Sequence, residues 1–393
     1  MSAATGRLGH GALTPLVVAS TVGAALGGFM FGFDTAVVNG AVDALKAELG
    51  VGSALVGVIV ASALLGAAVG AFAAGTIADR FGRRRLMMVA GTLFVTTSVL
   101  CAVAHDGPTL ALWRFLGGVG VGMASVVAPL YIAEIAPARL RGRLATAQQM
   151  SIVLGIFAAL VSNAFLVRAA GGAEAELALG LPAWRWMFLV AVVPSVAYVV
   201  AAVLLPESPR YLVMRGDRDG AARTLRRLHR VPEGDALLGV ATIEGTLHEA
   251  RPAWSHLFSG PGRLKPIVWL GIALAALQAL VGIDVIFYYS TSLWAQVGFG
   301  EQQAFWLSAL TSLVNVAATV VAIFLVDRVG RRRLLLVGSV GMTVALAVMA
   351  TGFAQAQQTA DGVAFVDAWG GVTLVAANVF VVTCAVSWGP VVW

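Results

Sequence analysis

The sequence predicts an all-α membrane protein made of two related helical bundles, and three observations support this. Of the 393 residues, 59% are hydrophobic and only 12% are charged, whereas an ordinary soluble domain carries about 25% charged residues. Ten apolar segments reach the roughly 20 residues that a spanning helix needs. A short basic motif also occurs twice, at equivalent places in the two halves of the chain.

The ten predicted spans are separated by breaks that contain charge, glycine or proline. They lie near 15–40, 53–78, 86–105, 108–133, 144–168, 184–205, 266–293, 303–326, 334–355 and 368–393. The two cysteines, Cys101 and Cys384, lie inside apolar runs without metal or redox spacing, so we expect them to pack as small apolar side chains. We expect no metal site, no cofactor and no enzymatic activity, because no cluster, triad or phosphate loop is present.

The distribution of basic residues predicts the orientation of the spans. The breaks after the second, fourth, sixth and eighth spans hold 21 of the 26 Lys and Arg residues. By the positive-inside rule these breaks and the N-terminus are cytoplasmic, which predicts a multi-pass protein of the plasma or inner membrane. The formal charge of +6 follows from this asymmetry. Because the arginines lie in short turns between spans, we expect the lipid bilayer and no nucleic acid as a partner.

An internal repeat predicts how the spans are grouped. Asp79–Leu86 (DRFGRRRL) and Asp327–Leu334 (DRVGRRRL) match at seven of eight positions and lie 248 residues apart. Asp34 and Asp284 each precede their copy of the motif by a similar distance. Repeats of the same sense are typical of transporters built from parallel halves.

The repeat divides the chain into three parts. We expect a six-helix bundle over 1–205, a cytoplasmic helical linker over 206–265 and a four-span bundle over 266–393. Asp219–Arg230 (DGAARTLRRLHR) is expected to form a short amphipathic helix. Two readings of the linker remain open: a solvated connection, or a small helical domain that touches the inner face of the bundle.

Further motifs resemble those of a known family. The repeated loop motif is similar to that of the major facilitator superfamily. The segments that resemble its sugar porter family are Arg114–Gly122 (RFLGGVGVG), Tyr131–Pro137 (YIAEIAP), Arg141-Gly142-Arg143, Pro206–Arg210 (PESPR), Gln278–Ser290 and Ser387–Trp393 (SWGPVVW). The resemblance covers nearly the whole chain.

The resemblance implies a fold and a function. It implies the major facilitator fold, with ten of an expected twelve spans, so the sequence looks like a fragment that stops inside the tenth. It also implies transport of a small neutral sugar or polyol by alternating access, with protons as the coupling ion. The alternatives are a facilitative sugar uniporter, a sugar sensor that does not transport, and an inactive fragment.

Asp34 and Arg114 are charged residues inside predicted spans. Such a charge costs at least ~3 kcal/mol on insertion scales, so the two are expected to pair. The pair could be a static link between the first and fourth spans. The resemblance implies instead a proton switch, in which the carboxylate gains and loses its cationic partner between conformations.

Polar and aromatic residues in other spans suit a sugar. An amide offers both a donor and an acceptor, as a sugar hydroxyl does, and tryptophan can stack on the C–H face of a sugar ring. By resemblance, the positions that contact sugar are Gln149, Gln278, Asn315 and Trp393. We also expect Trp388 and Tyr289 to belong to the substrate-binding site. For any single amide, the alternative is a helix–helix hydrogen bond, worth roughly 0.6 kcal/mol.

The seventh span departs from the family pattern. The family has two adjacent glutamines and a later asparagine, where this chain has Gln278, Ala279 and Asp284. We expect Asp284 to lie opposite Asp34 across the central cavity, without a basic partner, because Arg114 is the only cation expected inside the spans. Two neighbouring buried carboxylates resist ionising together. Asp284 either binds a substrate hydroxyl in place of the asparagine, or it adds a second proton site or admits a cationic or amino sugar.

Charged residues at the predicted cytoplasmic helix ends suit a gate. Opposite charges at facing ends can form ion pairs that hold the inner side shut, as the resemblance implies, while the arginines also fix orientation. The expected gate residues are Asp79, Arg80, Arg83, Arg84, Glu134, Arg141, Glu207, Arg210, Asp327, Arg328, Arg331 and Arg332.

Overall fold

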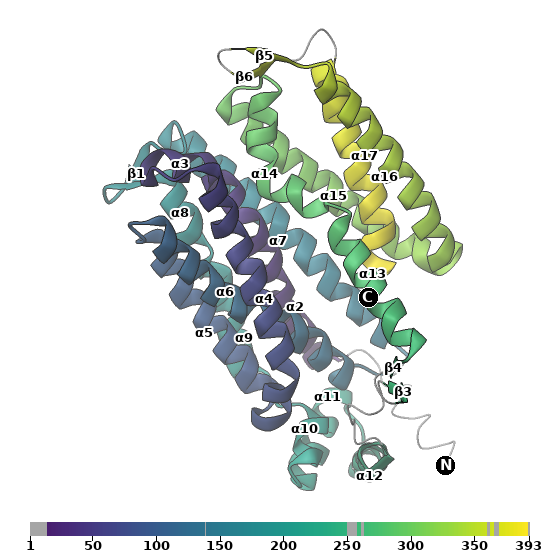
Figure 1. Ribbon diagram of the computed structural model, residues 1–393. Coiled ribbons are helices and arrows are strands. Elements are labelled where there is room, and N and C mark those ends of the chain that lie inside the picture. Colours follow the sequence, from purple (N-terminus) through teal and green to yellow (C-terminus); the bar gives the residue numbers. More distant parts are fainter. Residues whose placement is uncertain are drawn as a thin grey trace.

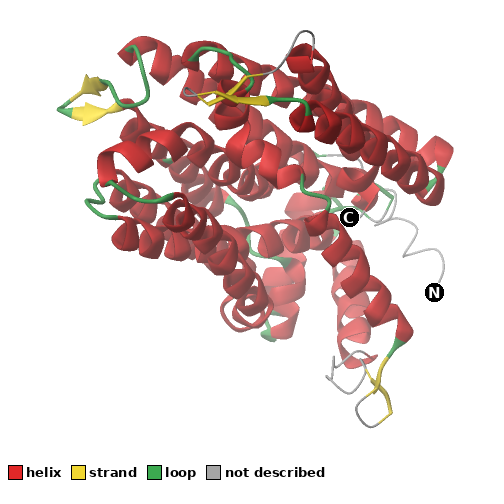
Figure 2. Cartoon of the chain, turned by 45° about the horizontal axis from the view of Figure 1, so that its top comes forward, coloured by secondary structure: helices red, strands yellow, loops and turns green. Residues whose placement is uncertain are grey.

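The structure, a computed structural model, is helical apart from three two-stranded hairpins (Figures 1 and 2). It describes residues 14–137, 139–249, 258–260, 263–359, 362–364 and 369–391, without the side chains of a few further positions. Within these ranges, ten helices are long and apolar enough to cross a membrane. They coincide with the ten predicted spans, so the prediction of an all-α membrane protein is confirmed.

The first half forms one bundle of six spans (Figure 1). Helix α2 leads through a 3-10 turn, η1, into α3, and α8 continues into α9 to make the sixth span. The elements are α2 (Pro15–Val37), η1 (Val38–Ala41), α3 (Val42–Leu49), α4 (Ser53–Phe81), α5 (Arg83–Ala102), α6 (Gly107–Ile135), α7 (Arg141–Ala170), β1 (Glu176–Ala178), β2 (Leu181–Pro182), α8 (Ala183–Val190) and α9 (Val192–Leu204).

Glycines set the closest helix contacts in this bundle. A Cβ atom at Gly66 or Gly70 of α4 would collide with the backbone of Phe115 or Val119 in α6. Glycines at 118 and 122 of α6 face the α4 backbone in return. Small residues four apart allow two helices to approach in this way inside a membrane.

The segment after the sixth span folds into three short helices, α10 (Pro209–Met214), α11 (Arg218–His229) and α12 (Glu233–Glu249). Leu225 of α11 and Val240 of α12 belong to an apolar core that these helices share. The predicted amphipathic helix is therefore confirmed as α11. The unit also contacts the bundle, because the Arg215 side chain donates to the carbonyl of Arg80. Of the two readings of this segment, the structure favours the helical domain that touches the bundle.

The second half contains four of the spans. Glycine 282, with φ of +85°, separates the two helices of the seventh span. The elements are β3 (Phe258–Gly260), β4 (Arg263–Leu264), α13 (Pro266–Leu280), α14 (Ile283–Gln296), α15 (Glu301–Val329), α16 (Arg331–Ala354), β5 (Gln357–Thr359), β6 (Gly362–Ala364) and α17 (Trp369–Val391).

The two halves meet along α7 and α15 and where η1 meets α14. Figure 1 shows α3, β1 and the β5–β6 hairpin at one end of the molecule and α10–α12 at the other. Large apolar side chains such as Leu65, Phe72 and Leu280 are exposed. In a membrane protein these surfaces face lipid, whose hydrocarbon core accepts apolar side chains.

Candidate functional site

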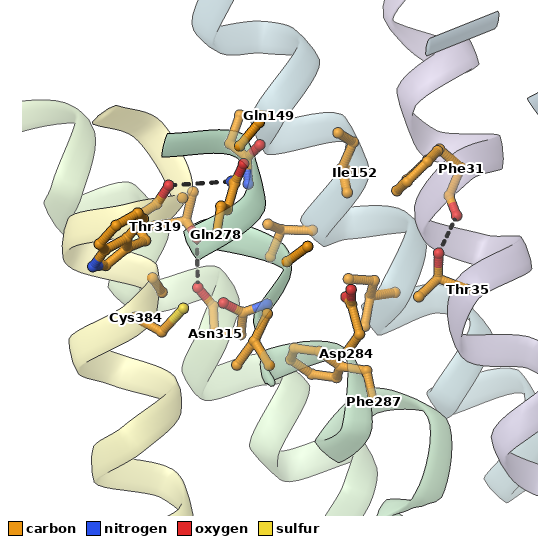
Figure 3. Close-up of a pocket in the computed structure, with 18 residues that line it drawn as sticks. Phe31, Thr35, Gln149, Ile152, Gln278, Asp284, Phe287, Asn315, Thr319 and Cys384 are labelled. Carbon is orange, nitrogen blue, oxygen red and sulfur yellow. Dashed lines mark hydrogen bonds between the residues drawn. The ribbon is translucent and has the colours of Figure 1, made fainter. Parts of the chain in front are cut away.

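A cavity of about 270 Å³ lies between the two halves. Helices α2 and α7 of the first half and α13, α14, α15 and α17 of the second half contribute its walls (Figure 3). Its polar and aromatic lining residues include Thr35, Gln149, Gln278, Asp284, Asn315, Thr319 and Trp388. The remaining lining residues are mostly apolar. A small number of polar groups in a mostly apolar cavity is typical of a small-molecule site.

The structure brings three predicted amides together at this cavity. Gln278 donates through Nε2 to the carbonyl oxygen of Trp388, at 3.4 Å. Within the described part of the chain, the side-chain amides of Gln149 and Asn315 make no hydrogen bond to another protein group. Because buried polar groups require partners, these two amides are available to a ligand with hydroxyl groups.

The predicted aromatic residues differ in their positions. Trp388 lines the cavity, and its indole N–H donates to Ser339 Oγ at 3.1 Å, so the ring is held in place. Tyr289 does not line this cavity; its ring lies beside that of Tyr288, with centroids 6.5 Å apart. Trp393 lies outside the described residues.

Asp284 is the one charged residue that lines the cavity within the described chain. It belongs to the first turn of α14, directly after the break at Gly282. The described residues contain no ion pair with Asp284. The N-terminus of a helix favours a negative charge nearby, so α14 partly compensates for the absent cation.

Asp34 does not line this cavity, and the expectation that it faces Asp284 across the cavity is wrong. Its carboxylate instead accepts a hydrogen bond from Arg114 Nη1 at 2.5 Å. The pair lines a separate space of about 10 Å³ inside the first bundle. Successive residues point about 100° apart on a helix, and it is the next residue, Thr35, that lines the central cavity.

The guanidinium of Arg114 is only partly satisfied. Arg114 is 2% exposed, and its Nε and Nη2 atoms lack a hydrogen-bond partner in the described chain. Unpartnered buried donors are costly. The small space beside the pair is close to the volume that one water molecule needs, and Thr97 and Ser98 also line it.

The first copy of the loop motif forms a closed network at the end of the molecule near α10. Arg83 donates to both carboxylate oxygens of Glu134, at 2.9 and 2.8 Å, and its Nη2 lies 3.0 Å from Asp79. Glu207 accepts from the backbone N–H groups of Arg83 and Arg84. The side chains of Arg83 and Glu134 are 3% and 6% exposed, so this shielded network fastens α5 to the end of α6 and to the segment that follows α9.

The remaining described gate residues of the first half form no ion pair among the described residues. The guanidinium of Arg84 donates to the carbonyl oxygens of Ala202 and Val203. Arg80 lies over the ring of Phe81 and is exposed, as is Arg210. The side chain of Arg141 lies outside the described part of the structure.

Among the described side chains, the second copy of the motif shows no such network. The side chains of Arg328, Arg331 and Arg332 are exposed, and the described residues show no ion pair for them. The side chain of Asp327 lies outside the described part. The structure therefore does not bring the gate residues of the second half together with those of the first.

Two polar clusters near α3 escaped the sequence reasoning. Arg185 is buried inside the sixth span and pairs with Glu48 at 2.8 Å. The expectation that Arg114 is the only cation inside the spans is therefore wrong. Asn39 of η1 bonds to Ser290, Thr291 and the carbonyl oxygen of Phe287 on α14, which joins the two halves. These residues belong to no recognisable motif, so the sequence does not indicate either cluster.

Comparison with known proteins identifies the family. The sequence profile described as "Sugar (and other) transporter" matches residues 20–393. The chain is 48% identical to a glucose transport protein of Synechocystis sp., over 94% of this chain and 79% of the relative. It is 31% identical to the D-xylose-proton symporter of Escherichia coli, over 95% of this chain and 77% of the relative. The chain therefore belongs to the sugar transporter family of the major facilitator superfamily.

The fold comparison agrees with this assignment. The structure matches the xylose transporter of Escherichia coli in a partially occluded inward open conformation, with a TM-score of 0.82 and 30% identity. The match covers 96% of this chain and 86% of that chain. The predicted major facilitator fold is confirmed, and this is a transporter and not an enzyme.

Proposed function

We propose that this transporter moves a small neutral sugar or polyol by proton-coupled symport. The observation that carries the proposal is the cavity between the halves. There the side-chain amides of Gln149 and Asn315 have no hydrogen-bond partner among the described residues, and Gln278 is held by only a 3.4 Å hydrogen bond. Amides bind hydroxyl groups without bringing a charge into the membrane. Relatives named as glucose and xylose transporters support this substrate class.

The Asp34–Arg114 pair supports coupling to protons. Neither side chain lines the central cavity, so binding an uncharged sugar does not require them. A proton on Asp34 would weaken its attraction to Arg114, and conformations that separate or join the pair would then differ in proton affinity. The second candidate is facilitated diffusion, with the pair as a static link between α2 and α6.

Uptake in liposomes separates the two candidates. The full-length protein would be reconstituted with labelled glucose or xylose, and uptake would be followed with and without an imposed proton gradient. Symport predicts accumulation above the equilibrium level only when the gradient is present. Equilibration to equal concentrations under both conditions would establish the uniporter instead.

We also propose that the end of the molecule with α10–α12 is cytoplasmic, together with the N-terminus. The excess of Lys and Arg at the second, fourth, sixth and eighth breaks supports this orientation. In the same scheme 1–205 and 266–393 are the two transport bundles and 206–265 is the linker. Single cysteines placed at the exposed positions Arg80 and Arg328 should both react with an impermeant thiol reagent from the cytoplasmic side alone. Labelling of either one from outside would refute the orientation.

A further inference from the structure

Two neighbouring helices of the first bundle present a shared apolar surface to the outside. Helices α5 and α9 lie side by side (Figure 1), and a Cβ atom at Gly91 of α5 would lie only 2.7 Å from a methyl group of Val199 on α9. Because the two helices are this close, their exposed side chains form one surface, here called the α5–α9 face. It consists of four residues that are 47% to 77% exposed: Val89, Val200, Val203 and Leu204.

Two arginines lie at the end of this face near α10. Arg84 donates through Nε to the carbonyl oxygen of Ala202, at 3.1 Å, and through Nη2 to that of Val203, so its guanidinium is held at the C-terminal end of α9. Arg85 is exposed. It lies one helical turn before Val89, so these two side chains share a face of α5. The apolar surface therefore ends at a pair of cations.

The acids of this region are already bonded to other groups. Asp79 and Glu134 pair with Arg83, and Glu207 accepts from backbone N–H groups at the start of α5. Among the described residues, Arg85 makes no hydrogen bond or ion pair. Its charge is therefore available to an anion from outside the protein.

The surroundings of Arg85 indicate what kind of anion fits. A soluble anion would use the charge but leave the apolar surface beside it uncovered. A phospholipid covers both, because its head group carries the charge and its acyl chains contact apolar side chains. Arginines at the border of a spanning helix attract anionic head groups. A zwitterionic head group fits less well, since its own ammonium group would lie near the two arginines.

We propose that the α5–α9 face binds one anionic phospholipid, with its phosphate at Arg84 and Arg85 and its acyl chains along the apolar residues. Arg84 uses Nε and Nη2 for the carbonyl oxygens, which leaves Nη1 to donate to a phosphate oxygen. Arg85 supplies a second guanidinium from the same helix. The site lies outside the central cavity, so it does not depend on the proposed symport.

Native mass spectrometry of the full-length protein in detergent tests this site. The protein would be titrated with phosphatidylglycerol or with phosphatidylcholine of the same acyl chains, and glycerol phosphate would be added as a head group without tails. Arg85→Gln removes the charge, Arg85→Lys keeps it, and Val89→Gln places a polar group among the apolar residues. Arg223→Gln is the matched control, because Arg223 is also an exposed arginine but lies on α11, outside the spans.

The proposal predicts a different result for each variant. Wild type should bind phosphatidylglycerol about tenfold more tightly than phosphatidylcholine, and Arg85→Gln should weaken phosphatidylglycerol binding about fivefold without changing phosphatidylcholine binding. Arg85→Lys and Arg223→Gln should bind both lipids as wild type does. Val89→Gln should weaken the binding of both lipids roughly threefold, because it acts on the acyl chains. Glycerol phosphate in excess should displace neither lipid.

Several outcomes would overturn the proposal. These are equal affinity of wild type for the two lipids, unchanged phosphatidylglycerol affinity in Arg85→Gln, and equal losses in Arg85→Gln and Arg223→Gln, which would show only general attraction to basic residues. Displacement by glycerol phosphate would identify a site for soluble anions instead. Sugar counterflow checks that each variant is folded. Failure of the proposed symport would leave these results unchanged, because lipid binding is measured without a proton gradient.

Discussion

The two copies of the loop motif have nearly the same sequence but different surroundings. The backbones agree: Gly82 and Gly330 both adopt positive φ, at +99° and +86°, a region that L side chains rarely occupy. The side chains differ. Arg83 is buried against Glu134, whereas its counterpart Arg331 is exposed. The motif therefore determines the turn, and acids on neighbouring helix ends determine whether its arginines are paired.

The same contrast extends to the bundles as a whole. In the first span, 61% of the most apolar stretch is buried, against 11% in the seventh span. Helix α13 has no buried residue. Six spans surround the first motif and four described spans surround the second. We therefore expect the first half to dominate the stability of this chain.

The largest expected effect is on folding. Arg83→Ala leaves Glu134 buried without its cation, which should lower the free energy of unfolding by about 3–5 kcal/mol. Arg331→Ala should change it by less than about 1 kcal/mol, because an exposed arginine contributes little. Denaturant titration of the two purified variants in detergent measures both values. Equal losses would show that the two motifs are energetically equivalent and would remove the contrast.

The next effect compares the paired acid of the first half with a surface acid. Asp34→Asn mimics a permanently protonated carboxyl, so sugar accumulation driven by a proton gradient should fall by roughly tenfold or more. Counterflow exchange should continue. Asp219→Asn, an exposed acid on α11, is the control and should accumulate normally. If Asp34→Asn still concentrates sugar, another group couples transport to protons.

A smaller effect concerns the contribution of the second half to the binding cavity. Gln278→Ala removes one amide from the site and should weaken sugar binding roughly threefold to tenfold, the usual worth of one net hydrogen bond. Gln302→Ala, on the exposed first turn of α15, should bind sugar as wild type. Equilibrium binding in detergent measures both, and an unchanged affinity for Gln278→Ala would place this amide outside the site.

The smallest effect concerns side-chain N-caps, which the described helices α13 to α16 lack. In the first half, Asp106 caps α6 by accepting from Thr109, and these hydrogen bonds lower the pKa of its carboxyl below the ordinary 3.8. The stabilisation is therefore present at neutral pH and is lost as the pH falls below about 3.8 through the lowered pKa. Asp106→Ala should lower the melting temperature by about 1–2 °C at pH 7.

Melting temperatures measured at acidic pH give the control for this last prediction. As the pH falls through the lowered pKa of Asp106, the difference in melting temperature between Asp106→Ala and wild type should shrink. A difference that stays constant from pH 7 through the acid range would show that the charge of Asp106 does not contribute to the cap.

The sequence predicts most of the polar residues that line the cavity, but it does not predict how Asp34 and Asp284 lie relative to each other. Gln149, Gln278 and Asn315 meet as expected because each lies on a span whose place in the bundle the family resemblance fixes. Asp34 was expected beside Asp284, yet it points into the first bundle. One residue along a helix turns a side chain by about 100°, and apolar spans with small residues on every side give no signal for that rotation.

The sequence alone determined the ten spans, the repeat, the family and the amides that suit a sugar. These are properties of hydropathy and local motifs, and they survive any small rotation of a helix. Only the tertiary structure decided that Arg185 pairs with Glu48, that α10–α12 pack into a unit and that one loop motif is buried while its copy is exposed. Each of these depends on which side chains neighbouring helices bring together, and that is decided by packing between segments far apart in the chain.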